Sequence, residues 1–103
     1  MSSILGLARG AEKLILRLYL AGESPLSLLA EANLREICKA HLEGRYELET
    51  IDVFEDPLRP IQDKIHLTPT LLRVYPTPSR RIVGDLSQHA TVLQELGIEA
   101  ALD

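Results

Sequence analysis

Apolar and polar residues alternate from Lys13 to Ala21, which is the pattern of a β-strand. Leucines occupy every second position and share one face, while Ile15, Arg17 and Tyr19 share the other. The pattern predicts a strand that is buried on at least one face. Gly22 marks its end.

A helix is predicted directly after this strand. Ser24 can cap it, and Pro25 suits its first position because the missing amide would be unpaired there anyway. Gly44 supplies a stop at the other end. Between them apolar residues recur at intervals of three and four, which predicts a buried stripe made of Leu26, Leu29, Ala30, Leu34, Ile37, Cys38 and Leu42.

A second strand and a short helix follow. The segment from Tyr46 to Phe54 alternates at first and then becomes apolar, so it is predicted to be a strand. The right-handed crossover rule makes the two strands parallel, with the helix on one face of the sheet. Asp56 to Ile65 predicts a short helix, and Pro60 is expected to delay its regular start because proline has no amide hydrogen.

A hairpin punctuated by prolines completes the predicted sheet. Pro69 leads into a strand-like run from Thr70 to Tyr75, and the residue types leave its peptide bond open as cis or trans. Pro76 and Pro78 separate this run from a second one, Arg80 to Gly84.

The last predicted element is a helix that Ser87 can cap and Gly97 can stop, with Val92, Leu93 and Leu96 facing inward and Ile98 folding back onto its last turn. The order β-α-β-α-β-β-α, with one mixed sheet and helices on both faces, is that of a thioredoxin-like α/β fold. We interpret residues 1–12 as a loose leader and residues 13–103 as a single domain.

Composition narrows the class of protein. The length of 103 residues suits one domain, and no apolar run approaches the ~20 residues that span a bilayer, so no membrane association is expected. The start of the chain lacks the features of a signal peptide, which favours a cytoplasmic protein. A net charge of −4 argues against non-specific binding of nucleic acid.

The candidate chemistry is sparse, and we expect no cofactor or metal. In a thioredoxin, a Cys-x-x-Cys pair begins the first helix, but here Gly22 to Ser27 hold that place, so dithiol redox chemistry is excluded. Cys38, the single cysteine, is interpreted as a core residue. His41, His66 and His89 lie in separate elements, and Asp52 and Asp85 are interpreted as structural residues at a strand end and a turn.

Several segments resemble the KaiB family of circadian clock proteins. They are Leu18-Tyr19-Leu20-Ala21-Gly22, Ile51-Asp52-Val53, Asp63-Lys64-Ile65 with Thr68-Pro69-Thr70-Leu71, and Pro76-x-Pro78-x-Arg80-Arg81-Ile82-Val83-Gly84-Asp85-Leu86-Ser87. The last run is long and specific, and the match covers about Lys13 to Val92. The resemblance implies a non-enzymatic protein that docks on the ring of the ATPase KaiC.

The resemblance also implies partner-binding residues. Lys64, Arg73 and Arg80 are the positive groups expected near an acidic KaiC surface. Where the family typically presents a small residue and a lysine to its partner KaiA, this chain has Glu47 and Glu49. Because a reversed charge at an interface usually lowers affinity, KaiA is not expected to be sequestered.

The family further implies two folds, a tetrameric ground state with a rearranged C-terminal half and a monomeric thioredoxin-like state. Glu95 stands where the family tends to have glycine, and it favours a helix by about 1 kcal/mol. We therefore expect mainly the thioredoxin-like monomer, with a tetramer if the other fold is populated. The residues expected to determine the fold are Pro69, Pro76, Pro78, Gly84, Asp85, Glu95 and Gly97.

Two alternatives from other classes stay open. One is a degenerate thioredoxin-like redox or stress protein that uses Cys38 with a mixed-disulfide partner, which requires a reactive thiol of low pKa. The other is a free-standing version of the KaiB-like sensor domain found in some histidine kinases.

Overall fold

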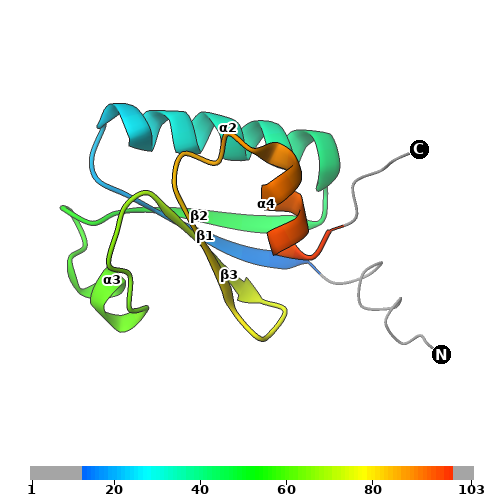
Figure 1. Cartoon of the computed structure of the whole chain (residues 1–103). Helices are drawn as coiled ribbons and strands as arrows, with labels where there is room; N and C mark the ends of the chain where they lie inside the picture. The colour runs from blue at the N-terminus through cyan, green and yellow to red at the C-terminus, as the bar shows by residue number, and fades with distance from the viewer. Residues whose placement is uncertain (1–12, 99–103) are drawn as a thin grey trace.

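The computed structural model describes residues 13–98, which form one four-stranded sheet with helices on both faces (Figure 1). The chain order is β-α-β-α-β-β-α, as the sequence predicts. The elements are β1 (Leu14–Leu20), α2 (Pro25–His41), β2 (Tyr46–Asp52), α3 (Leu58–Gln62), β3 (Thr70–Tyr75), β4 (Arg80–Val83) and α4 (His89–Leu96). The predicted leader, residues 1–12, lies outside the described residues.

The sheet has the strand order β2-β1-β3-β4. β1 and β2 are parallel and in register from Leu14 opposite Tyr46 to Leu20 opposite Asp52, which confirms the predicted βαβ unit. β3 runs antiparallel to β1, and β4 runs antiparallel to β3 as the predicted hairpin. The peptide bonds before Pro69, Pro76 and Pro78 are all cis.

The two faces of the sheet bury different clusters. On one face, under α2 and α4, lies the main core, whose members include Leu16, Leu18, Leu34, Ile37, Leu71 and Leu93. On the other face Tyr19, Ile51 and Leu72 are buried with Val53, Ile65 and Val74 around them. The alternation in β1 thus sorts its side chains as predicted, with leucines on one face and Tyr19 on the other.

The first turn of α2 differs from the prediction. Ser24 does cap the helix, since its hydroxyl accepts from the amide of Ser27 at 3.3 Å. However, Leu26 and Leu29, predicted to be part of the buried stripe, are 53% and 50% exposed. Ser27 is buried instead, and its hydroxyl accepts from the amide of Ala21 at 3.0 Å. Ser27 occupies the inward position of this turn, where its hydroxyl pairs with an amide of the preceding loop. Leu26 and Leu29 therefore remain exposed to solvent.

The prediction for Pro60 is wrong. α3 begins at Leu58, and Pro60 lies within its first turn. Amide hydrogens of the first turn have no partner inside the helix, so a proline there removes no hydrogen bond. The helix is also shorter than predicted, because it ends at Gln62 rather than near Ile65.

The two ends of α4 compare differently with the prediction. Ser87 does not cap the helix, which starts at His89; instead the amide of Ser87 donates to the Asp85 carboxylate at 3.0 Å. Gly97 ends the helix as predicted, with φ 81° in the left-handed region. The amide of Ile98 donates to the Leu93 carbonyl at 2.9 Å, and its side chain packs back on the main core.

Candidate functional site

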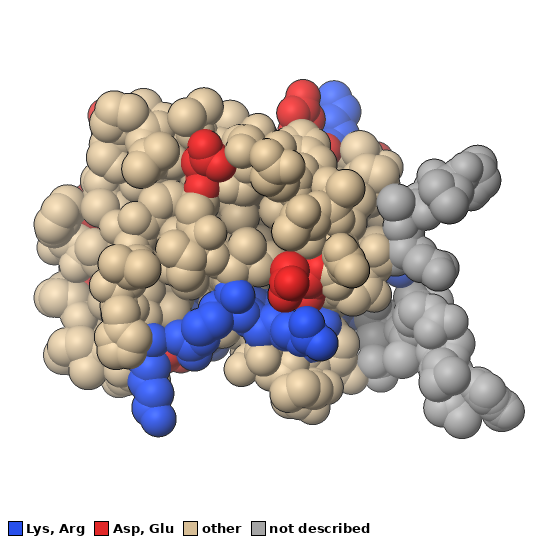
Figure 2. Space-filling model, in the orientation of Figure 1, with Lys and Arg blue, Asp and Glu red and all other residues tan. Residues whose placement is uncertain are grey.

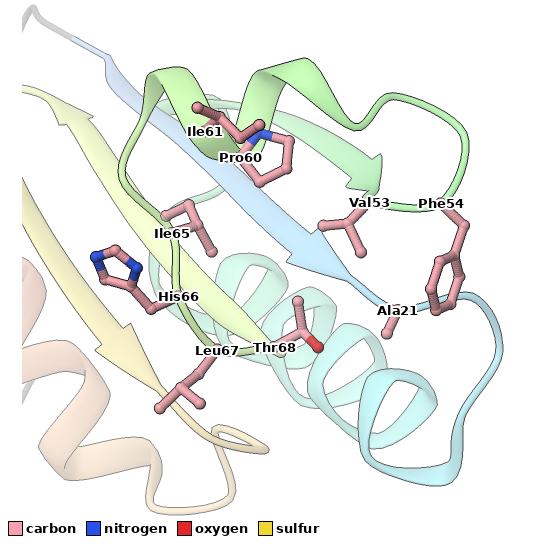
Figure 3. Close-up of a pocket in the computed structure, with 9 residues that line it drawn as sticks. All are labelled: Ala21, Val53, Phe54, Pro60, Ile61, Ile65, His66, Leu67 and Thr68. Carbon is pink, nitrogen blue, oxygen red and sulfur yellow. The ribbon is translucent and has the colours of Figure 1, made fainter.

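A groove opens beside the carboxyl ends of β1 and β2 (Figure 3). Its volume is about 340 Å³. It is lined by Ala21, Val53, Phe54, Pro60, Ile61, Ile65, His66, Leu67 and Thr68, which come from the ends of β1 and β2, from α3 and from the segment before β3. The lining is mainly apolar, and the side chains of Phe54, Ile61 and Leu67 are 74%, 71% and 61% exposed. A concave apolar surface with this exposure is typical of a binding site.

Asp52 shapes one wall of the groove. Its carboxylate accepts from the amide of Phe54 at 2.9 Å and from the amide of Gly22 at 3.1 Å. The side chain therefore joins the two turns that follow β2 and β1, which confirms its structural interpretation. Gly22 has φ 58°, and a Cβ there would lie 3.5 Å from the Phe54 ring, so this turn requires glycine for its backbone and not for space.

A polar network fixes α3 to the sheet. Asp63 accepts from the hydroxyl of Tyr19 and from Nη1 of Arg17, the latter at 2.9 Å. Burial raises the pKa of Asp63, but these two bonds and the positive charges of Arg17 and Arg59 together outweigh it and hold the pKa below its usual value. Burial, together with the bond to Asp63, raises the pKa of Tyr19 to about 12. These bonds therefore attach the C-terminal end of α3 to strand β1.

Glu49 is engaged within the chain. It accepts two bonds from Arg59, at 2.8 and 2.9 Å, and Arg17 lies 3.9 Å away. The bond from Arg59 lowers the pKa of Glu49, and the same bond raises the pKa of Arg59. Glu47, two positions earlier on the edge strand β2, is exposed. The two glutamates therefore differ in the charge that they present. Glu47 leaves its negative charge exposed, whereas the charge of Glu49 is largely neutralised by Arg59.

Exposed cations lie beside the groove and along β4. Lys64 follows α3 and is exposed, and Arg81 of β4 donates to the carbonyls of Lys64 and Asp63 at 2.6 and 3.0 Å. Arg80 lies 3.6 Å from Glu95 of α4, and both side chains are about half exposed. Figure 2 shows Lys and Arg side chains forming a band across the lower part of this face. Lys64 and Arg80 are thus surface residues, as expected of partner-binding groups.

Arg73 is not placed as the sequence interpretation expects. It is only 7% exposed, and its guanidinium donates to the carbonyl of Leu96 at 2.9 Å and to that of Pro78 at 2.6 Å. It thus connects the end of α4 to the hairpin, and in this fold it does not present a charge to a partner. Its position, two residues from the inward Leu71, explains the burial, because alternate residues of a strand share a face.

The other residues considered for chemistry, apart from His66, lie away from the groove or are buried. Cys38 is 0% exposed, and burial raises the pKa of its thiol to about 11, so it lacks the accessible thiolate that a redox role needs. His66 lines the groove, whereas His89 lies within 3.4 Å of Asn33 and His41 ends α2. Among residues 13–98 no three His, Cys, Asp or Glu side chains are grouped as metal ligands would be. Nor does the described part of the chain contain a helix long and apolar enough to cross a membrane.

Sequence reasoning did not nominate the apolar groove residues. Phe54 is the last residue of a predicted strand, and Leu67 precedes the proline turn at Pro69. The available signal is that Leu67 is a large apolar residue outside any periodic pattern, where no buried face is expected.

The fold is shared with thioredoxins and with the N-terminal domain of a protein named SasA. Chloroplastic thioredoxin z aligns with a TM-score of 0.68 at 22% identity, over 93% of this chain and 87% of that one. The N-terminal domain of Synechococcus elongatus SasA also aligns with a TM-score of 0.68, at 21% identity, over 90% of this chain and 91% of that one. These likenesses confirm the predicted thioredoxin-like fold.

The sequence matches are closer. The KaiB domain model matches residues 17–98. The circadian clock oscillator protein KaiB of Prochlorococcus marinus (strain NATL2A) is 45% identical over 89 residues, which are 86% of this chain and 81% of that protein. The circadian clock protein KaiB3 of Synechocystis sp. is 44% identical over 86 residues, 84% of each chain. The chain therefore belongs to the KaiB family.

Proposed function

We propose that this protein is a non-enzymatic interaction module that docks on a KaiC-type ATPase ring and regulates it, in circadian timing or a related response in the cytoplasm. The observation that carries the proposal is the exposed apolar groove at the carboxyl ends of β1 and β2, bordered by Lys64. Membership of a family of clock proteins supports the choice of partner. In this proposal the apolar side chains supply the contact area, and Lys64 meets an acidic group of the ring.

The state that docks is proposed to be the thioredoxin-like monomer. Three features support this state in the C-terminal half: the hydrogen bond from Arg73 to the Leu96 carbonyl, the left-handed Gly97 that ends α4, and the ion pair between Arg80 and Glu95. A rearranged C-terminal half is expected to lose these features, so the equilibrium between the two folds is expected to favour the monomer here. Light scattering of the free protein is expected to give a monomer mass, and a tetramer would contradict this part of the proposal.

The test is co-elution of the protein with a KaiC-type hexamer in the presence of ATP. Lys64→Glu is expected to weaken the complex at least tenfold, because it places a negative charge against an acidic surface. Lys39→Glu is the matched control, since Lys39 is an exposed lysine in the last turn of α2. Equal binding of both variants would refute the role of Lys64, and absence of binding by the unchanged protein would refute the proposal.

KaiA is proposed not to bind tightly to this complex. Glu47 is exposed on the edge strand and Glu49 is held by Arg59, so this edge presents negative charge and no free cation from these positions. Addition of KaiA to the complex is expected to leave KaiA free on gel filtration. A stable ternary complex would contradict this expectation.

The redox alternative is disfavoured, because Cys38 is buried and the pKa of its thiol is raised rather than lowered. The sensor-domain alternative shares the proposed partner, and the likeness to the SasA domain concerns the fold alone.

A further inference from the structure

Large exposed apolar side chains gather at one end of the sheet, beyond the groove itself. β1 ends at Leu20, and α2 begins five residues later. β3 starts at the same end, because Thr70 pairs with Tyr19, and β4 finishes there, because Val83 pairs with Thr70. The exposed residues at this end include Phe54, Ile61 and Leu67 of the groove, and also Leu26, Leu29 and Val83, which do not line it.

The helical geometry of α2 places Leu26 and Leu29 on one flank. At about 100° per residue they lie on the same side as Asn33. The Asn33 side chain donates to the Asp85 carbonyl at 2.8 Å, so this flank faces the connection that follows β4. Leu28, which is 53% exposed, lies on the opposite flank. Leu26 and Leu29 therefore lie on the flank of α2 toward the connection after β4, whereas Leu28 lies on the other flank.

The size of this surface indicates what occupies it. With about 200 Å² for a fully exposed large side chain, the six residues present roughly 700 Å², close to the ~800 Å² that each partner contributes to a standard interface. None of the six carries a charge, and Figure 2 shows the end of the molecule with the start of α2 and with α3 as tan almost throughout. A folded partner with an uncharged, apolar contact face fits this surface.

We infer that the docking surface for the ATPase continues from the groove across the first turn of α2, where Leu26 and Leu29 pack against an uncharged apolar face of the ATPase subunit. The inference rests on the proposed function and specifies the chemistry of the partner at that site. The α2 leucines supply contact area, while Lys64 supplies an electrostatic contact on the far side of the groove. The two contributions are therefore separable.

The experiment compares Leu29→Ser with Leu28→Ser, two leucines of one helical turn with exposures of 50% and 53%. Affinity for a KaiC-type hexamer with ATP is measured by titration of labelled protein. Leu29→Ser, and Leu26→Ser with it, are expected to weaken binding at least tenfold, whereas Leu28→Ser stays within twofold of the unchanged protein. Circular dichroism of all variants is expected to match, because the three side chains are exposed.

The outcomes separate the two ideas. If the unchanged protein binds, Lys64→Glu weakens the complex and the Leu26 and Leu29 variants bind normally, then the inference is wrong and the proposed function stands. If the unchanged protein does not bind, both fall. If the free protein forms a dimer that Leu29→Ser dissociates, the surface serves a second copy of this chain and the inference is also wrong.

Discussion

Replacing Arg73 tests how α4 is held on the sheet. Arg73→Met keeps an unbranched apolar stem of similar length but removes the donors to the carbonyls of Leu96 and Pro78. Two hydrogen bonds from a charged donor contribute about 1.5–3 kcal/mol each. Part of this is offset, because Nε of Arg73 is buried without a partner among the described residues, and removing it relieves about 1–3 kcal/mol. The net loss expected is about 2–3 kcal/mol.

The assay is urea unfolding followed by circular dichroism. With a slope of about 1.5 kcal/mol/M, the midpoint is expected to fall by about 1.3–2 M. Arg80→Met is the control, because its exposed pair with Glu95 contributes about 0–1 kcal/mol. Hydrogen exchange should locate the loss in α4. An unfolding free energy for Arg73→Met within about 0.5 kcal/mol of the unchanged protein, or one equal to that of Arg80→Met, would refute this reasoning.

Two further predictions concern ionisable groups. The pKa of Asp63 is lowered in the fold, so its stabilisation is present above the unfolded pKa of about 4 and is lost as the pH falls through the folded value. Asp63→Asn is expected to flatten the fall in unfolding free energy between about pH 5 and pH 2, measured by urea unfolding at stepped pH, and an unchanged slope would contradict the network. Cys38, buried with a raised pKa, is expected to react with a thiol reagent at neutral pH only after urea unfolds the chain, and rapid reaction of the native protein would restore the redox alternative.

Periodicity predicted those parts of the fold whose side chains alternate between core and solvent. The leucines of β1 and the later part of the α2 stripe, Ala30, Leu34, Ile37 and Cys38, are buried as predicted. The stripe failed in its first turn, because Ser27 is needed there to satisfy the amide of Ala21. The need to pair this loop amide arises outside the helix, so the periodic pattern of the helix residues does not reveal it.

The candidate site was predicted only in part, for the same reason. Lys64 and Arg80 lie at the surface, but residue type alone gave no indication that Arg73 is buried. Its alternation with Leu71 was the available signal, and the charge was given more weight than the pattern. Phe54 and Leu67 are far apart in the sequence, and both line the groove because the turn after β2 and the segment before β3 lie at the same end of the sheet.

The most direct test of the account is whether the unchanged protein binds a KaiC-type hexamer in ATP, measured by size-exclusion chromatography with light scattering. A complex of higher mass than the hexamer and a free protein of monomer mass are expected. A monomer that never elutes with the hexamer, at concentrations well above micromolar, would contradict it.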